Sequence, residues 1–134
     1  MTRRSAALVL TALLLVLTGA AQPAQAAGYR YWSFWDRSAS AWTYATQGPS
    51  TARPADGDVQ GFRFAVSADS QDATRPRGAA SFAAICAKTP ARDGMKRVAL
   101  VIDFGTAADA PGGDAPPSPA PRTACARVAS GATT

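Results

Sequence analysis

The hydrophobic pattern is densest over Tyr29–Trp35, the run Tyr-Arg-Tyr-Trp-Ser-Phe-Trp, in which five aromatic residues are interrupted by one arginine and one serine; it is the most aromatic stretch of the chain. Residues of this bulk favour a pleated, extended backbone, so the run predicts a β-strand. Because side chains alternate between the faces of a strand, one face carries Tyr29, Tyr31, Ser33 and Trp35, and the other carries Arg30, Trp32, Phe34 and Asp36. The second set contains an apolar pair, Trp32 and Phe34, that is suited to a core. The aromatic rings of the first set have polar tips, so we expect that face to be half exposed.

Two more strands are expected next. Asp36–Ala41 is polar and suits a hairpin loop, and Trp42–Ala45 then forms the returning strand. Further on, three apolar residues alternate with three others, which predicts a half-buried strand: Phe62, Phe64 and Val66 against Arg63, Ala65 and Ser67. Arg63 is expected on the solvated outer side. Gly61 marks either a bulge or a close approach of two backbones.

A short helix and a central strand follow. Apolar residues spaced by three and four predict a helix over Ala79–Lys88, with Ser81 as its cap and Thr89-Pro90 at its end. Val98–Phe104 is apolar on both faces and rich in β-branched residues, so it predicts a central strand covered on both sides. The strand, helix and strand together suit a crossover between parallel strands.

The last part of the chain has little apolar pattern. Residues 105–124 carry five of the ten prolines and predict an extended surface loop. Residues 125–134 are small and polar and predict a flexible tail. Cys86 and Cys125 are the two cysteines, and in an exported protein they are expected to form a disulfide.

The N-terminus has the features of a secretory signal peptide over residues 1–26. Arg3 and Arg4 precede the apolar stretch Ala6–Leu17, and Ala24-Gln25-Ala26 suits the cleavage site. We therefore expect a secreted protein of the extracellular space or cell envelope, in contact with a membrane only through its transient signal peptide.

The expected fold is α+β and mostly β, a small single domain with one short helix packed on a sheet and one disulfide. An all-β sandwich is the alternative, in which Ala79–Lys88 is irregular. The β-rich globular domain is expected over residues 27–104, followed by the loop at 105–124 and the tail from Cys125.

Composition limits the chemistry. The net charge is +5, and removal of Arg3 and Arg4 reduces the 14 basic residues to 12 against 9 acidic ones, which gives +3. The basic residues form no run, so nucleic-acid binding is not indicated. Histidine and glutamate are absent, which rules out a Ser-His-Asp or Cys-His arrangement within this chain and leaves a poor set of metal ligands. No metal and no cofactor are expected.

Five segments of the mature chain are similar to a family of uncharacterised exported proteins of high-GC Gram-positive bacteria: Tyr31–Trp35, Trp42–Pro49, Asp56–Val59, Phe62–Ser67 and Arg97–Gly105. The family brings no activity with it.

A second, local similarity covers roughly Tyr31–Phe64. The pattern Trp42-x-Tyr44, Gly48, Asp56-Gly-Asp-Val59 and Phe62-Arg-Phe64 resembles the transcobalamin-like carboxy-terminal domain, a small β-rich unit that closes over a corrinoid in cobalamin carriers. The resemblance implies an extracytoplasmic module for a small ligand in nutrient uptake.

The first functional hypothesis is a secreted, non-enzymatic binding module whose aromatic surface takes a small flat ligand or a saccharide. Its candidate ligand-binding residues are Tyr29, Tyr31, Trp35, Trp42, Tyr44 and Arg63. The alternative is a structural or protein-interaction component of the cell envelope, in which the aromatic residues form the core and an envelope protein is the partner. An enzyme is not expected, because Asp56 suits a turn with Gly57 and Asp103 suits a strand end, where it can accept backbone hydrogen bonds.

Overall fold

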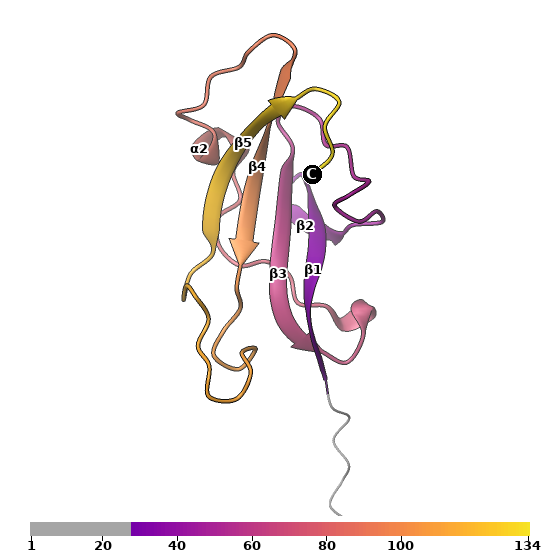
Figure 1. The fold of residues 1–134 in the computed structure, drawn as a ribbon, viewed down its shortest axis with the longest axis vertical. Coiled ribbons are helices and arrows are strands. Elements are labelled where there is room, and N and C mark those ends of the chain that lie inside the picture. Colours follow the sequence, from indigo (N-terminus) through magenta and orange to yellow (C-terminus); the bar gives the residue numbers. More distant parts are fainter. Residues whose placement is uncertain (1–27) are drawn as a thin grey trace, which may run out of the picture.

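The computed structural model describes residues 28–134, which are built on a five-stranded mixed sheet (Figure 1). The strands lie in the order β2-β1-β3-β4-β5, and all neighbours are antiparallel except β3 and β4. The elements are β1 (Tyr29–Ser38), β2 (Ala41–Tyr44), β3 (Val59–Ser67), the 3-10 helix η1 (Ser70–Asp72), α2 (Phe82–Ile85), β4 (Met95–Asp103) and β5 (Arg122–Ala129). The expected signal peptide lies outside the described residues.

The first hairpin is tighter than expected. β1 continues to Ser38, and the turn consists of Ala39 and Ser40 alone. Ala39 has a φ of 52°, in the left-handed region that a two-residue hairpin turn requires. The polar residues at 36–38 therefore belong to the strand and not to a loop.

The connection from β3 to β4 joins two parallel neighbours, as the sequence predicts. Its helix is much shorter than the expected Ala79–Lys88, because only Phe82–Ile85 is helical. The predicted cap is confirmed, since the Ser81 hydroxyl accepts a hydrogen bond from the Ala84 amide at 3.3 Å. The helix ends at Cys86, where the disulfide fixes the chain against the sheet.

Strand β5 differs from the expected flexible tail. It pairs with β4 over eight residues, with Cys125 opposite Ala99. Its small side chains give no clear alternation, so the pairing with β4 is what makes this segment a strand. The predicted disulfide between Cys86 and Cys125 is confirmed.

The core lies on one face of the sheet, here called the covered face. It consists of Trp35, Trp42, Val59, Cys86, Ala99 and Val101. Partly buried residues from the β3–β4 connection, including Phe82 and Ile85, pack against it. Gly61 lies within this face, and a Cβ there would come within 2.8 Å of the Trp42 and Pro76 rings. Neither expectation for Gly61 is met, because two side-chain rings and not a second backbone approach it, and it pairs with Trp35 and Val101 without a bulge.

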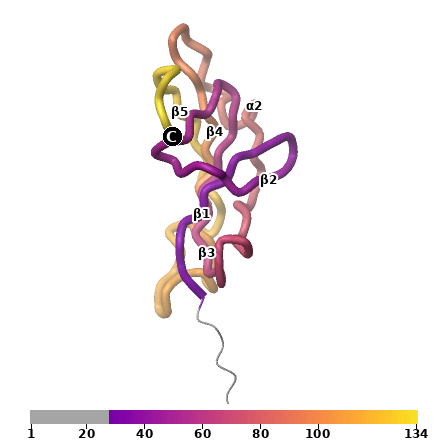
Figure 2. Tube along the Cα trace, turned by 90° about the vertical axis from the view of Figure 1, so that its right-hand side faces the viewer, coloured from indigo at the N-terminus to yellow at the C-terminus, as the bar shows by residue number. Residues whose placement is uncertain are grey.

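The opposite face, here called the open face, has no helix on it. It carries Trp32, Phe34, Phe62, Phe64 and Ile102, with Phe104 directly after β4. Figure 2 views the sheet from its edge, with α2 on one side and the segment after β5 on the other. The expected small, mostly β domain with one short helix and one disulfide is confirmed, and the described strands form one sheet, not a sandwich. In residues 28–134, no helix is long and apolar enough to span a bilayer.

Candidate functional site

The structure separates the aromatic residues that the sequence groups into one platform. Trp35 and Trp42 are core residues, with 5% and 8% of their surface exposed. Tyr29 is 71% exposed and Tyr44 is also exposed. Tyr31 is half-buried and donates its hydroxyl hydrogen to a backbone carbonyl of the loop after β3 at 2.9 Å. The expectation that these rings share one half-exposed face is wrong, because both tryptophans belong to the core.

The face assignment of β1 is reversed for a specific reason. The indole N–H of Trp35 donates to the Ser33 hydroxyl at 2.8 Å, and that hydroxyl donates to the Arg63 carbonyl at 3.1 Å. The polar tip is thus satisfied inside the protein, which removes the main cost of burying the ring. Of the pair assigned to the core, Phe34 is buried as expected, whereas Trp32 is 46% exposed.

Arg63 is not a solvated residue of the outer face. Its side chain is buried, and its two terminal nitrogens bond to Asp103 Oδ2 at 2.6 Å and to Asp109 Oδ2 at 2.9 Å. Asp103 lies directly opposite Arg63 in the parallel register of β3 and β4. The Phe-Arg-Phe pattern therefore places its arginine in the covered face and its two rings in the open face.

Asp103 is fully buried and accepts several more hydrogen bonds. Arg77 donates from its backbone N–H at 2.8 Å and from two side-chain nitrogens at 2.8 and 3.0 Å, and the Gly105 amide donates at 3.0 Å. Burial alone would raise the pKa of Asp103, but the hydrogen bonds from Arg77, Gly105 and Arg63 outweigh it and hold the pKa well below its usual range. The carboxylate stays ionised, and its expected role at a strand end is confirmed.

Arg63, Arg77 and Asp103 form a charged cluster, and Asp109 connects this cluster to the Pro-rich loop between β4 and β5. Besides Arg63, its carboxylate accepts hydrogen bonds from the Thr106 amide and hydroxyl, both at 2.8 Å, and from the Val66 amide at 3.2 Å. Burial favours a higher pKa for Asp109, but the Thr106 and Val66 hydrogen bonds and the charge of Arg63 lower it. Arg77 adds hydrogen bonds to the carbonyls of Gly105 and Pro119. The loop is therefore held to the sheet by charged groups.

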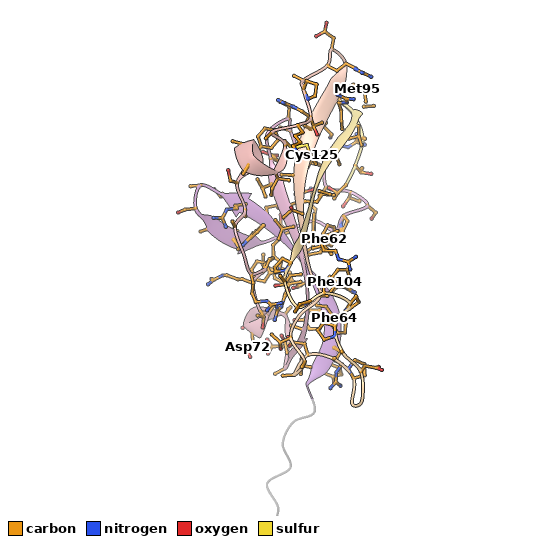
Figure 3. All side chains as sticks on the ribbon, turned by 90° about the vertical axis from the view of Figure 1, so that its left-hand side faces the viewer. Phe62, Phe64, Asp72, Met95, Phe104 and Cys125 are labelled. Atoms are coloured by element: carbon orange, nitrogen blue, oxygen red, sulfur yellow. A yellow bond between two sulfur atoms is a disulfide. The ribbon has the colours of Figure 1, made fainter. Side chains whose placement is uncertain are left out.

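The open face presents a cluster of aromatic rings. The Trp32 ring centroid lies 5.5 Å from that of Phe64, in a tilted arrangement, and 5.5 Å from that of Phe104, edge to face. Phe34 and Phe62 form a second pair at 4.9 Å. Figure 3 shows Phe62, Phe64 and Phe104 along the side of the sheet that lies away from α2. We call Trp32, Phe62, Phe64, Ile102 and Phe104 the aromatic patch.

Two adjoining hollows lie over this patch. Trp32, Phe62, Ile102 and Phe104 line the first, and their lining is almost entirely apolar. The second lies between the patch and the Pro-rich loop, which supplies Pro111, Pro116 and Pro117 to its wall together with Asp114 and two alanines. Both hollows are shallow and open to solvent, and flat rings with few polar groups are features of a surface that takes an apolar ligand. Sequence reasoning missed this patch, because alternation within strands does not tell which face is covered.

The remaining aspartates considered from the sequence have structural roles. Asp56 accepts hydrogen bonds from the backbone N–H of Arg97 at 2.7 Å and from its guanidinium, and these lower its pKa. The Asp58 carboxylate accepts a hydrogen bond from the Ala55 amide at 2.8 Å, which closes the turn between these two residues. Among residues 28–134, no group of three potential metal ligands comes together.

A family model described as the SCO2322-like domain matches residues 24–134. The chain belongs to the SCO2322-like domain family. This match includes the whole sheet, the charged cluster and the aromatic patch. Among curated proteins and among solved structures, no significant match to the chain is found. The family assignment therefore comes without a known ligand or activity, and any function must be argued from the geometry.

Proposed function

We propose that this chain is a secreted, non-enzymatic binding module and that the aromatic patch is its ligand-contacting surface. The observation that carries this proposal is the exposure of Trp32. It is the one tryptophan in the described residues with a large exposed surface, and it lies against two phenylalanine rings in a shallow, open, apolar setting. Exposed apolar clusters of this kind are expensive to keep in water and usually mark a binding site.

Export is the accompanying proposal, with removal of residues 1–26. The resemblance of the mature chain to exported proteins of high-GC Gram-positive bacteria supports it. The disulfide is also consistent with a compartment outside the cytoplasm.

The resemblance to the transcobalamin-like domain implies a more specific ligand, a corrinoid-type nutrient. Phe62 and Phe64 of that motif contribute rings to the aromatic patch. Trp42 of the same motif is a core residue, and Asp56 and Asp58 serve turns and ion pairing. If a corrinoid binds, it therefore contacts the open face and not the residues that the motif shares in the core.

Equilibrium dialysis of the oxidised chain against corrinoids and cell-wall saccharides tests the proposal. Trp32→Ala should weaken retention of a bound ligand by about tenfold or more, since burying an aromatic ring contributes roughly 1.5–3 kcal/mol. Tyr29→Ala is the matched control, because Tyr29 is more exposed than Trp32 and lies on the other face of the same strand. A ligand retained equally by both variants would refute the assignment of the patch.

A second candidate function is interaction with an envelope protein, and strand β5 favours it. β5 lies at the edge of the sheet, is eight residues long, and contains neither lysine nor proline. An edge strand without proline can accept an added strand from another chain, and the charges of Arg122 and Arg127 are the features of β5 that oppose such pairing. Cross-linking of the secreted chain in intact cells distinguishes the two candidates: a specific partner joined through β5, with no small molecule retained in dialysis, supports the second.

A further inference from the structure

The first hollow of the aromatic patch sets a requirement on its ligand. Its four lining side chains are Trp32, Phe62, Ile102 and Phe104, none of which carries a charged group or a carbonyl. A ligand group with unsatisfied hydroxyl or amide hydrogen bonds would lose its water there without gaining partners. The part of the ligand that enters this hollow is therefore apolar.

A cation lies at the margin of this hollow. Arg122 is directly opposite Ile102 in the β4–β5 register, on the same face of the sheet. Its guanidinium carbon is 5.4 Å from the centroid of the Phe104 ring. Its one side-chain hydrogen bond within residues 28–134 runs from Nη2 to the Pro117 carbonyl at 3.3 Å, and it forms no ion pair with the described residues.

The charges nearby favour an anion at this margin. A second exposed arginine, Arg30, lies two residues before Trp32, but its Nε donates to the Asp109 carbonyl at 3.2 Å, so it is held to the Pro-rich loop and not to the first hollow. Asp114 is the one acidic residue that lines either hollow, and it lines the second, under the Pro-rich loop, and not the first. Arg122 thus makes one margin of the first hollow positive, while the lining of the hollow stays apolar.

We propose that the ligand is an amphipathic organic anion, whose apolar body lies over Trp32, Phe62 and Ile102 and whose carboxylate pairs with Arg122. This inference rests on the proposed function and narrows it to a ligand class. Charge complementarity decides between ligand types: a neutral apolar molecule would leave Arg122 unused, and a cation would be repelled by it.

Three soluble probes that share a chain of eight carbon atoms and differ in charge test whether the ligand is an anion: octanoate, octan-1-ol and octylammonium. Two-dimensional NMR follows the amide shifts of the full oxidised chain during each titration. At low ionic strength, octanoate should bind about threefold to fivefold more tightly than octan-1-ol, the range of a partly exposed ion pair. Octylammonium should bind most weakly. The advantage of octanoate should fall in 1 M salt, where the Debye length is about 3 Å.

Arg122→Gln should abolish the preference for octanoate but leave binding of octan-1-ol unchanged. Arg92→Gln is the matched control, since Arg92 is exposed in the loop before β4 and has no ion pair among the described residues. Equal affinities for octanoate and octan-1-ol, with shifts at the open face, would overturn the anionic class and retain the proposed function.

Two other outcomes would contradict the role of Arg122 or the proposed function itself. Tighter binding of octylammonium would contradict the role of Arg122 directly. If no probe causes saturable shifts on the open face, both the ligand class and the small-molecule function fail. Concentration-dependent dimerisation in the analytical ultracentrifuge, together with that absence of binding, would assign the face to a second copy of this chain.

Discussion

Replacing Asp103 with asparagine removes the central charge of the buried cluster and keeps the shape of the side chain. In the intact protein the carboxylate pairs with Arg63 and Arg77 and is fully buried. Breaking a buried pair by removing one partner costs about 3–5 kcal/mol, because a buried charge is left without compensation. Asp109 still pairs with Arg63 in the variant, so we expect about 3 kcal/mol. Domains of this size have roughly 5–15 kcal/mol in total, so the loss is large.

Urea unfolding at neutral pH, followed by tryptophan fluorescence with the disulfide intact, measures this loss. Asp56→Asn is the matched control, since it makes the same substitution in an aspartate that is also held by an arginine guanidinium. The Asp56 side chain is 47% exposed, so solvent screens its pair and its loss should be far smaller.

The pH dependence gives a second readout of the same charge. The pKa of Asp103 is lower in the folded state than in the unfolded chain, where it is about 3.9. Its contribution is therefore fully present above that unfolded pKa and is lost as the pH falls towards the folded value. The stability difference between the wild type and Asp103→Asn should shrink below about pH 4. A loss under about 1 kcal/mol at pH 7, or a difference that stays constant from pH 7 to pH 3, would refute this reasoning.

Three further changes have defined outcomes. Gly61→Ala should cost about 1–3 kcal/mol in urea unfolding, since its Cβ would overlap an indole ring and a proline ring, whereas Gly48→Ala meets nothing within 4 Å and should have little effect. Replacing Cys86 and Cys125 with alanine should cost about 4 kcal/mol, the chain-entropy value for a separation of 39 residues, measured against the oxidised protein. Trp32→Phe should remove most of the fluorescence that acrylamide quenches in the native state, and unchanged quenching would contradict the exposure of Trp32.

Much of the fold follows from local sequence patterns. The density of aromatic residues indicates β1, the Phe-Arg-Phe pattern indicates β3, and the β-branched run Val98–Phe104 indicates β4. Ser81 is a local capping signal, and the presence of two cysteines in a chain that is expected to be exported suffices to predict their pairing. β5 was missed because its strand character comes from hydrogen bonds to β4, a long-range feature that its small side chains do not reveal.

The faces of the strands were assigned wrongly because alternation divides the residues of a strand into two faces but does not tell which of the two is buried. β1 carries large rings on both sides, and polarity at their tips suggested that Trp35 faces solvent. The hydrogen bond to Ser33 reverses that preference, but it depends on the neighbouring strand. Once one strand is inverted, its neighbours invert with it, because paired residues share a face. Phe62 therefore moves to the open face and Arg63 to the covered one.

The sequence contains the residues of the charged cluster, but their pairing could be predicted only from the order and register of the strands. Arg63 lies in the middle of one strand and Asp103 at the end of another, each separately explicable as a surface or capping residue. Only the parallel register of β3 and β4 places them opposite each other. Asp109 comes from a segment without apolar periodicity, so nothing local indicates that it reaches Arg63.

The charged cluster and the aromatic patch belong to one arrangement, because the Pro-rich loop connects them. That loop has no strand or helix of its own, and its prolines cannot donate backbone hydrogen bonds. Asp109 and Arg77 supply the missing contacts, from Arg63 inside the protein to the carbonyl of Pro119 in the loop. A buried ion pair is weak grounds for high stability, since apolar residues often replace it without loss. What this cluster provides is position: it holds the proline wall of the second hollow beside Trp32.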